Sequence, residues 1–376
     1  MTKSTHVFLG AISTLLILVF LANPALALTL NGAITAIADR LEAEQIKDGA
    51  DIGSWPEEAT FTGSIVAGMI DSYELTGESA YKDSAQLGGN YIFRTAQGSF
   101  YADESLAFTR LSAIADDPLD NVWRSAVSYF YFQIKYGFDG GTYGYISIHS
   151  GRDPSEIVIS LANLLVAANY VNAKDLEIWR QGLINWLSHV DDSCALPVTT
   201  LGIAMWALAK TGPLDDTLID PFGTGAPYWN MKRLKDLPGL LLSHQVPDGE
   251  SGTGSFYWRF DHGDGNSDET QISGYTEDTI FATRGLIAAY SANPDPNDPN
   301  LTSAILSAHE VLLGSVSPDG IISELLSREG AVYYLYAGEM LNVLRELESV
   351  LPKEKGLGLD NRVNSIETSI VAKKSL

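Results

Sequence analysis

Residues 157–190 read IVISLANLLVAANYVNAKDLEIWRQGLINWLSHV, and this stretch decides the fold class. Its first half, Ile157–Val171, is apolar on nearly every side, which is typical of a helix that is buried all round. Its second half carries charged residues such as Lys174 and Glu177 on one face, which is typical of a surface helix. The stretch therefore predicts a buried helix paired with a surface helix.

The same alternation recurs along the chain, and no convincing strand alternation accompanies it. Surface helices are predicted at 31–46, 79–95, 120–136, 173–190, 231–245 and 301–314. Buried helices are predicted at 62–76, 103–115, 155–171, 197–211, 277–292 and 331–348. Six surface helices alternating with six buried helices predict an all-α protein, an (α/α)6 toroid with inner and outer helix layers. An irregular helical array or an open solenoid is the alternative.

The composition excludes several classes of protein. The chain has 376 residues, with 24 Lys and Arg against 47 Asp and Glu, so its formal net charge is −23. This acid excess argues against nucleic acid as a partner and against docking on an anionic membrane surface. The single cysteine, Cys194, excludes a disulfide framework and a multi-thiolate zinc site.

Three regions differ in composition. Residues 1–27 contain Lys3, the apolar run Val7–Ala22 and small residues at Ala25-Leu26-Ala27, which together predict a cleaved signal peptide. An uncleaved anchor helix is the alternative. The toroid is predicted to span 28–350, and residues 351–376 lose apolar periodicity and are predicted to be a disordered tail. We therefore expect a secreted or periplasmic protein.

The loops also repeat. Leu41-x3-Gln45 is followed by Gly53-Ser54-Trp55, and Leu241-x3-Gln245 is followed by Gly254-Ser255-Phe256. A shorter version is Gln97-Gly98-Ser99-Phe100. Gln is expected to bond carbonyls left open at the end of the surface helix, glycine permits the tight loop, and the aromatic ring fastens it to its neighbour.

This pattern resembles the QW repeat of squalene–hopene cyclases, in the terpenoid cyclase/protein prenyltransferase toroid superfamily. The resemblance implies a toroid and, by analogy, an isoprenoid or lipid enzyme. The cyclase motif Asp-x-Asp-Asp is absent. Prenyltransferases hold zinc with Asp-x-Cys and a distant His. Asp192 and Cys194 match the pair, but Asp278 stands where the His is expected.

In a toroid the inner helices run in one direction, so the loops that precede them meet at one mouth. Acids recur at two equivalent inner-helix starts, which makes Asp103, Glu104, Glu277 and Asp278 the candidate catalytic residues. Carboxyl groups on opposite walls are what a glycosidase needs, one as acid and one as base or nucleophile. The alternative is that these acids only complement helix dipoles.

Aromatic and cationic residues of the same loops are the candidate substrate contacts, because aromatic faces pack on sugar rings and cations neutralise uronates. These candidates are Trp55, Tyr143, Tyr145, His149, Arg152, Trp258, Arg259 and Arg328. Trp55 has the alternative role of fastening its loop. Arg110 and Arg284, two turns inside buried helices, are expected to pair with acids, either structurally or in the cavity lining.

No cofactor is predicted, and calcium is the one metal that the sequence leaves open. Oxygen ligands on a glycine-rich loop suit Ca²⁺, and Asp261, Asp264, Asn266 and Asp268 supply them, although their spacing does not fit an EF-hand. A solvated acidic loop is the alternative.

The sequence leaves three functions open. The leading hypothesis is an exported carbohydrate-active protein, a glycoside hydrolase or polysaccharide lyase that binds an oligosaccharide or polysaccharide. The second is a non-catalytic binding or scaffold protein with a protein partner. The third is the isoprenoid or lipid enzyme that the resemblance implies.

Overall fold

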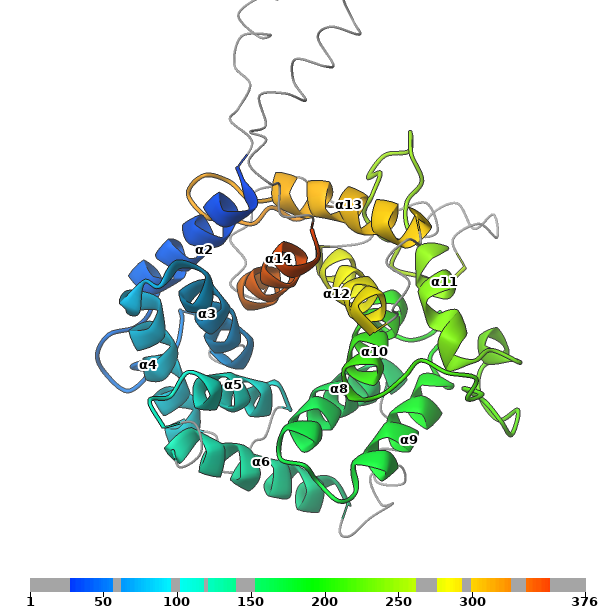
Figure 1. The fold of residues 1–376 in the computed structure, drawn as a ribbon, viewed down its shortest axis with the longest axis horizontal. Helices are drawn as coiled ribbons and strands as arrows, with labels where there is room; N and C mark the ends of the chain where they lie inside the picture. Colours follow the sequence, from blue (N-terminus) through cyan, green and yellow to red (C-terminus); the bar gives the residue numbers. More distant parts are fainter. Residues whose placement is uncertain are drawn as a thin grey trace, which may run out of the picture.

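Twelve α-helices form two concentric rings in the computed structural model, which describes residues 28–56, 62–95, 102–117, 121–139, 153–261, 276–292, 299–325 and 336–351 (Figure 1). The outer helices are α2 (Leu30–Glu44), α4 (Ser79–Thr95), α6 (Val122–Asp139), α9 (Leu176–Leu187), α11 (Leu237–Leu242) and α13 (Pro299–Gly314). The inner helices are α3 (Thr62–Thr76), α5 (Ala102–Ala113), α8 (Pro154–Tyr170), α10 (Pro197–Thr211), α12 (Thr276–Ala292) and α14 (Ala337–Val350). These ranges contain no strand, only isolated β-bridges.

The inner ring is closed. Each inner helix packs against the next, in the order α3, α5, α8, α10, α12 and α14, and α14 packs back against α3 (Figure 1). Residues at the starts of neighbouring inner helices contact each other, as Thr199 of α10 and Asp278 of α12 do. These helices therefore run in the same direction. The predicted (α/α)6 toroid is therefore confirmed, and the open solenoid is excluded.

Burial follows the two kinds of apolar pattern. In α10 every residue from Pro197 to Leu208 is buried, because the inner helices α8 and α12 and the outer helices α9 and α11 pack against it. In α9 the buried side chains form a stripe that includes Trp179, Leu183 and Leu187. The outer helices therefore turn one face to the core, as an amphipathic sequence requires. Among the described helices, none has the length and apolar character needed to cross a bilayer.

Glycines allow the inner helices to touch backbone to backbone. A Cβ atom on Gly202 of α10 would lie 2.4 Å from the carbonyl oxygen of Phe281 in α12. A Cβ atom on Gly68 of α3 would lie 2.8 Å from the carbonyl oxygen of Gly338 in α14. Larger residues at these contacts would push the inner ring apart.

We expect Gly202→Ala to destabilise the protein by about 1–3 kcal/mol, because its methyl group meets immobile backbone. Gly182→Ala on outer helix α9 is the matched control, since a Cβ atom there has no neighbour within 4 Å. The control should gain up to about 1 kcal/mol from helix propensity. Urea unfolding of both variants measures the difference, and equal stabilities would contradict the close contact.

The two repeated loops have the same structure. Gln45 donates its side-chain amide to the carbonyl oxygens of Gly53 and Ser84, both at 3.0 Å. Gln245 donates in the same way to Gly254 at 3.1 Å and to Ala304 at 2.9 Å. Each Gln therefore ties its own loop to the next outer helix. The expectation that Gln bonds the open end of its own helix is wrong.

The glycines of these loops lie against the same neighbouring helices. Gly53 and Gly254 have positive φ values of 100° and 86°, which favour glycine. A Cβ atom would lie 2.3 Å from the oxygen of Leu87 in α4 for Gly53, and 2.6 Å from the oxygen of Ser307 in α13 for Gly254. Gly320 makes the same contact with α2, where a Cβ atom would lie 2.2 Å from the oxygen of Ala36. These loops join consecutive hairpins around the ring.

Several sequence predictions lie outside the described residues. They are the signal peptide at 1–27, residues 352–376 of the tail, and the loop Gln97–Phe100.

Candidate functional site at the inner-helix N-termini

A carboxylate from a distant loop caps the start of α12. Glu324, which is 8% exposed, accepts hydrogen bonds from the Thr276 backbone N–H at 2.7 Å and from the Thr276 hydroxyl at 3.0 Å. The Leu325 backbone N–H donates in turn to the Thr276 hydroxyl at 3.1 Å. Because a helix N-terminus carries unpaired N–H groups and a positive dipole end, it holds this carboxylate in place.

Glu277 is the next residue of α12, and it is half-buried. Burial, with a further contribution from the negative charge of Glu324, raises the pKa of the Glu277 carboxyl to about 7. A carboxyl group with this pKa is partly protonated near neutral pH and can deliver a proton to a leaving oxygen. Of the adjacent acids at this helix start, Glu277 is the more exposed.

Asp278 is 1% exposed and accepts a hydrogen bond from the Thr199 hydroxyl at 2.8 Å. This contact joins the starts of α10 and α12, so it serves the packing of the inner ring. Glu104 is 8% exposed at the start of α5, which lies across the ring from α12 (Figure 1). Asp103 belongs to the first turn of the same helix. Carboxyl groups from opposite walls therefore occur at these helix starts.

Trp258 and Arg259 lie beside the start of α10. The Trp258 carbonyl oxygen accepts from the Val198 N–H at 3.4 Å, and the Arg259 guanidinium lies 4.1 Å from the Trp258 ring centre. Asp192 fixes the same segment, because it accepts from the backbone N–H groups of Phe260 at 2.6 Å and Asp261 at 2.9 Å. Trp258 and Arg259 are both half-buried.

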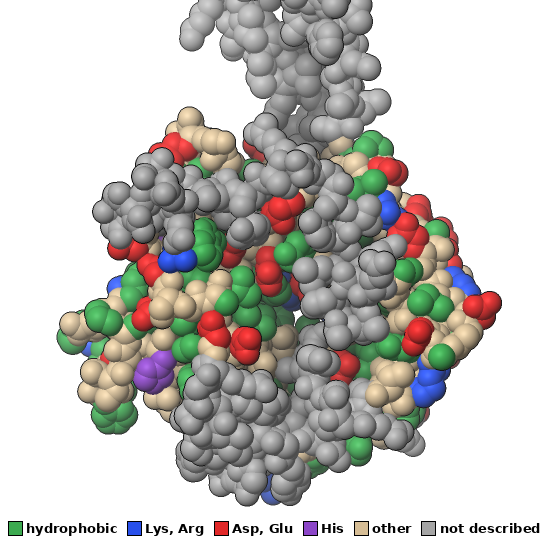
Figure 2. All heavy atoms as spheres, turned by 180° about the vertical axis from the view of Figure 1, so that it is seen from behind, with side chains coloured by type: hydrophobic (Ala, Val, Ile, Leu, Met, Phe, Trp, Pro, Cys, Tyr) green, Lys and Arg blue, Asp and Glu red, His purple; other side chains and the backbone are tan. Residues whose placement is uncertain are grey.

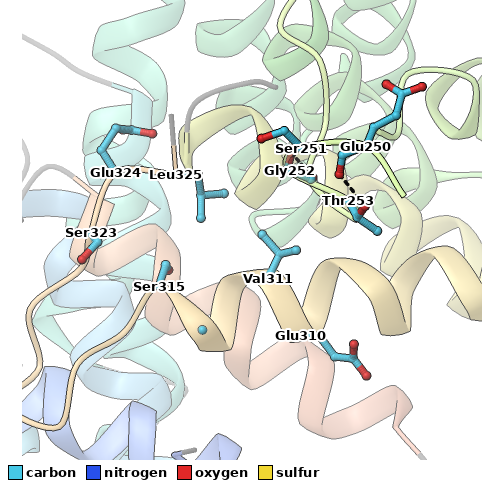
Figure 3. A pocket seen from close by; sticks show the side chains of 12 residues that line it. Glu250, Ser251, Gly252, Thr253, Glu310, Val311, Ser315, Ser323, Glu324 and Leu325 are labelled. Atoms are coloured by element: carbon cyan, nitrogen blue, oxygen red, sulfur yellow. Dashed lines mark hydrogen bonds between the residues drawn. The ribbon is translucent and has the colours of Figure 1, made fainter. Parts of the chain in front are cut away.

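A pocket of about 600 Å³, here called the side pocket, lies next to Glu324. Figure 3 shows its walls, which are the loop Glu250–Thr253, the segment Ser323–Leu325 and the C-terminal half of α13. Serine hydroxyls and carboxylates line it, including Ser255, Ser315 and Glu310. The side pocket gives a polar ligand access to Glu324.

The remaining candidates fall into two groups. Tyr143, Tyr145, His149, Arg152, Arg328, Asp264, Asn266 and Asp268 lie outside the described residues. Trp55 is described, but it is 1% exposed and its indole N–H donates to the Leu41 carbonyl oxygen at 2.8 Å. This placement contradicts the predicted substrate contact, because the ring fastens the loop to α2 and offers no face to a ligand.

The described residues give no metal site. No group of three His, Cys, Asp or Glu side chains in these ranges could hold a metal ion. Cys194 is buried, and burial raises the pKa of its thiol. Two carboxylates stand at the positions compared with the prenyltransferase zinc ligands. Asp192 accepts hydrogen bonds from the backbone N–H groups of Phe260 and Asp261, and Asp278 accepts one from the Thr199 hydroxyl.

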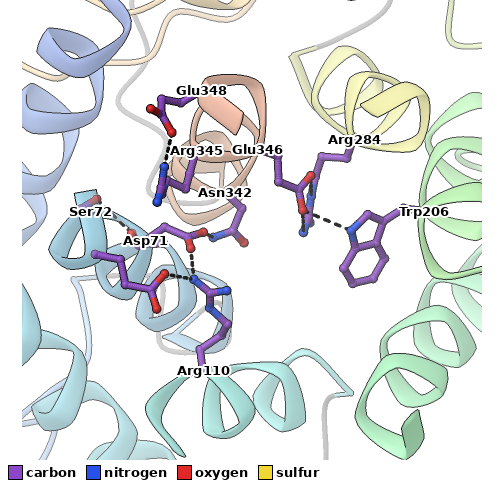
Figure 4. A network of polar contacts seen from close by, with 11 residues as sticks. Asp71, Ser72, Arg110, Trp206, Arg284, Asn342, Arg345, Glu346 and Glu348 are labelled. Atoms are coloured by element: carbon purple, nitrogen blue, oxygen red, sulfur yellow. Dashed lines mark hydrogen bonds and ion pairs between the residues drawn. The ribbon is translucent and has the colours of Figure 1, made fainter. Parts of the chain in front are cut away.

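A second polar region, here called the axial cavity, lies at the C-terminal halves of the inner helices and has a volume of about 610 Å³. Figure 4 shows Arg110 of α5 directed at Asp71 of α3, to which it is ion-paired. Asp71 also accepts from the Asn342 amide at 2.8 Å, and burial raises its pKa to about 6 despite the Arg110 charge. Arg110 further pairs with Glu74 at 3.0 Å.

The opposite wall of the axial cavity holds a second pair. Arg284 of α12 contacts Glu346 of α14 at 3.4 Å and lies 4.6 Å from the ring centre of Trp206 (Figure 4). The expectation that Arg110 and Arg284 pair with acids is therefore confirmed, and both pairs line a cavity. From the face opposite to Figure 1, acidic side chains lie beside an opening near the centre of the ring (Figure 2).

Sequence reasoning missed Glu324, Asp71 and Glu346. Asp71 could have been singled out from the sequence, because it is an acid within the largely apolar segment 62–76. Glu324 could not have been singled out from the sequence, since its position depends on a contact with Thr276, 48 residues away along the chain.

Comparisons with solved structures agree on the fold. The α-1,6-mannanase GH76A of Salegentibacter sp. HEL1_6, an inactive variant in complex with α-1,6-mannotriose, is similar with a TM-score of 0.54 and 13% identity over 85% of this chain and 99% of that chain. A glycosyl hydrolase of family 88 from Bacteroides vulgatus matches with a TM-score of 0.54 and 12% identity over 85% and 98%. The unsaturated glucuronyl hydrolase of Bacillus sp. GL1 matches with a TM-score of 0.52 and 13% identity over 88% and 98%.

No protein-family model matches the sequence, and no curated protein matches it. At 12–13% identity the structural likeness establishes the (α/α)6 toroid. The structures compared above are glycoside hydrolases, so the comparisons support the toroid but not the terpenoid cyclase/protein prenyltransferase superfamily in particular.

Proposed function

We propose that the protein is an exported glycoside hydrolase whose site lies at the start of α12. The observation that carries the proposal is Glu277, a half-buried carboxyl group whose pKa is raised to about 7 beside the charged Glu324. A proton-donating carboxyl group beside a second carboxyl group is the chemistry that glycoside hydrolysis requires. Toroidal glycosidases that act on oligosaccharides support the same reading by analogy.

In this mechanism Glu277 protonates the glycosidic oxygen as the bond to the leaving sugar breaks. Glu324, held by Thr276 at the helix N-terminus, supplies negative charge to the developing oxocarbenium ion or activates the attacking water. A sugar ring in the side pocket lies next to Glu324. The export part of the proposal rests on the N-terminal apolar run alone.

A second candidate is a non-catalytic binding protein. It is favoured by the axial cavity, where Asp71, Glu74 and Glu346 are all paired with arginines. The isoprenoid or lipid hypothesis has less support, because eight charged residues line this cavity.

The test is a panel of substrates incubated with the purified protein. The panel contains α-1,6-mannotetraose, cellotetraose and an unsaturated glucuronyl disaccharide, with product formation followed by chromatography. Hydrolysis of one class, with activity that falls as the pH rises through about 7, is expected because Glu277 must be protonated. Binding without product formation would favour the non-catalytic binding protein. The absence of both binding and product formation would contradict the carbohydrate proposal.

We expect Glu324→Gln to lower the pKa of Glu277, because the substitution removes the neighbouring negative charge that helps to raise it. Because Glu324 is also the proposed second catalytic carboxylate, kcat/KM itself should fall, and the alkaline limb of the residual activity should move to lower pH. The amide oxygen of Gln can still accept from Thr276, so the helix cap is kept. A carbon-detected NMR titration of the glutamate carboxyl groups gives the same answer without a substrate, and an unchanged Glu277 pKa would contradict the coupling.

A further inference from the structure

The axial cavity lies away from the proposed catalytic carboxylates. Its lining includes Asp71, Arg110, Arg284 and Glu346 from the C-terminal halves of inner helices, whereas Glu277 begins α12. Its volume of about 610 Å³ falls within the range of ligand sites. The proposed hydrolase chemistry does not use any of these groups.

Charge in the axial cavity is balanced. Its lining holds four acids, Asp71, Glu74, Glu346 and Glu348, and four bases, Arg110, Lys210, Arg284 and Arg345. Three of the bases pair with acids of the same lining, namely Arg110, Arg284 and Arg345. The cavity therefore offers no excess of either sign to a charged ligand.

The pairs still have hydrogen-bonding capacity. Glu346 is held by long contacts only, 3.4 Å to Arg284 and 3.3 Å to the Trp206 indole N–H. The Nε of Arg110 is buried and has no hydrogen-bond partner among the described residues. Between these polar groups the wall is apolar, with Leu106 and Val166. Polar side chains from α3, α5, α12 and α14 surround one space (Figure 4), and Leu106 and Val166 belong to the same lining.

The class of ligand follows by elimination. Except at Lys210, which is exposed, a charged ligand would have to compete for a partner of an existing ion pair. Displacing Arg110 would leave the nearly buried Asp71 without its ion-pair partner, and displacing Glu346 would do the same to Arg284, which is costly. A purely apolar ligand would cut these polar groups off from water without replacing their hydrogen bonds. A sugar or other polyol carries adjacent hydroxyl groups that both donate and accept, together with apolar ring faces. We propose that the axial cavity is a second binding site, for a neutral sugar or similar polyol.

NMR of the tryptophan indole N–H groups tests this site separately from the catalytic one. The chain has seven Trp residues, of which Trp206 lines the axial cavity and Trp258 lies near the start of α10. Trp206→Phe and Trp258→Phe assign the two signals. α-1,6-Mannotriose, cellotriose, glucuronate and spermidine are then titrated into the full chain carrying Glu277→Gln, which prevents turnover.

We expect a neutral trisaccharide to shift the Trp206 signal, and we expect Leu106→Phe, which narrows the cavity without changing its charge, to weaken that binding. A shift of the Trp206 signal is expected even where the Trp258 signal does not move, because binding in the axial cavity should not require a sugar at the catalytic site. No Trp206 shift with either neutral sugar, a shift with glucuronate or spermidine alone, or an affinity that Leu106→Phe leaves unchanged would overturn the proposal. Hydrolysis in the substrate panel reports on the proposed function separately.

Discussion

Glu277→Gln is expected to reduce kcat/KM on the preferred glycan by about 10²–10⁴-fold, the range associated with loss of a general acid. The amide has nearly the same shape but no acidic proton, so substrate binding should change little. The pKa of Glu277, raised to about 7 by burial and by Glu324, explains why this carboxyl group is suited to donate a proton. Steady-state kinetics with the substrate found in the panel measures the loss.

Glu156→Gln is the matched control for this experiment. Glu156 also lies in the first turn of an inner helix, α8, but it is exposed. If the first-turn acids acted only through the helix dipole, both variants would show the same small effect, about 0.3–1 kcal/mol in stability. Full activity of Glu277→Gln would contradict the assignment of Glu277 as the acid.

Trp55→Ala is expected to lower the free energy of unfolding by about 3–5 kcal/mol, the cost of removing a large aromatic side chain from a core. The side chain is 1% exposed, and its indole N–H also donates to the Leu41 carbonyl oxygen. The loop that Trp55 fastens connects α2 to α3, and Gln45 ties the same loop to α4. Urea unfolding followed by circular dichroism measures the loss.

Trp55→Phe should cost less, because Phe256 occupies the equivalent position of the second loop and is fully buried there. It keeps an aromatic ring but loses the indole hydrogen bond. Neither variant should change sugar affinity while the protein remains folded. A loss of affinity without a loss of stability would restore Trp55 as a substrate contact.

The fold followed from local patterns in the sequence. The all-apolar segment Ile157–Val171 and the one-sided segment after it correspond to inner helix α8 and outer helix α9. Such patterns are readable because burial on all sides or on one side directly constrains which residues each helix can carry. The repeated glycines also predicted tight loops, and Gly53 and Gly254 have the left-handed backbone that requires them.

The site was only partly predictable. The parallel inner helices allowed the acids at helix starts to be singled out, and one of them, Glu277, has a pKa raised to about 7 by burial and by Glu324. The same rule selected Asp278, yet its side chain is buried against Thr199. Adjacent residues of a helix point about 100° apart, so the sequence does not distinguish them.

The sequence by itself determined most of the helices, which of them are buried, and where the chain turns, because each of these depends on neighbours within a few residues. The exception is the predicted helix 231–245, where the structure has a 3-10 turn at Leu234–Asp236 and the short helix α11 (Leu237–Leu242). Only the tertiary structure decided which charges meet. Asp71 meets Arg110 from 39 residues away and Asn342 from 271 residues away, and Glu324 reaches Thr276 across 48 residues. The raised pKa of Glu277 has the same origin, since burial and the charge of a distant loop act on it only when the ring is closed.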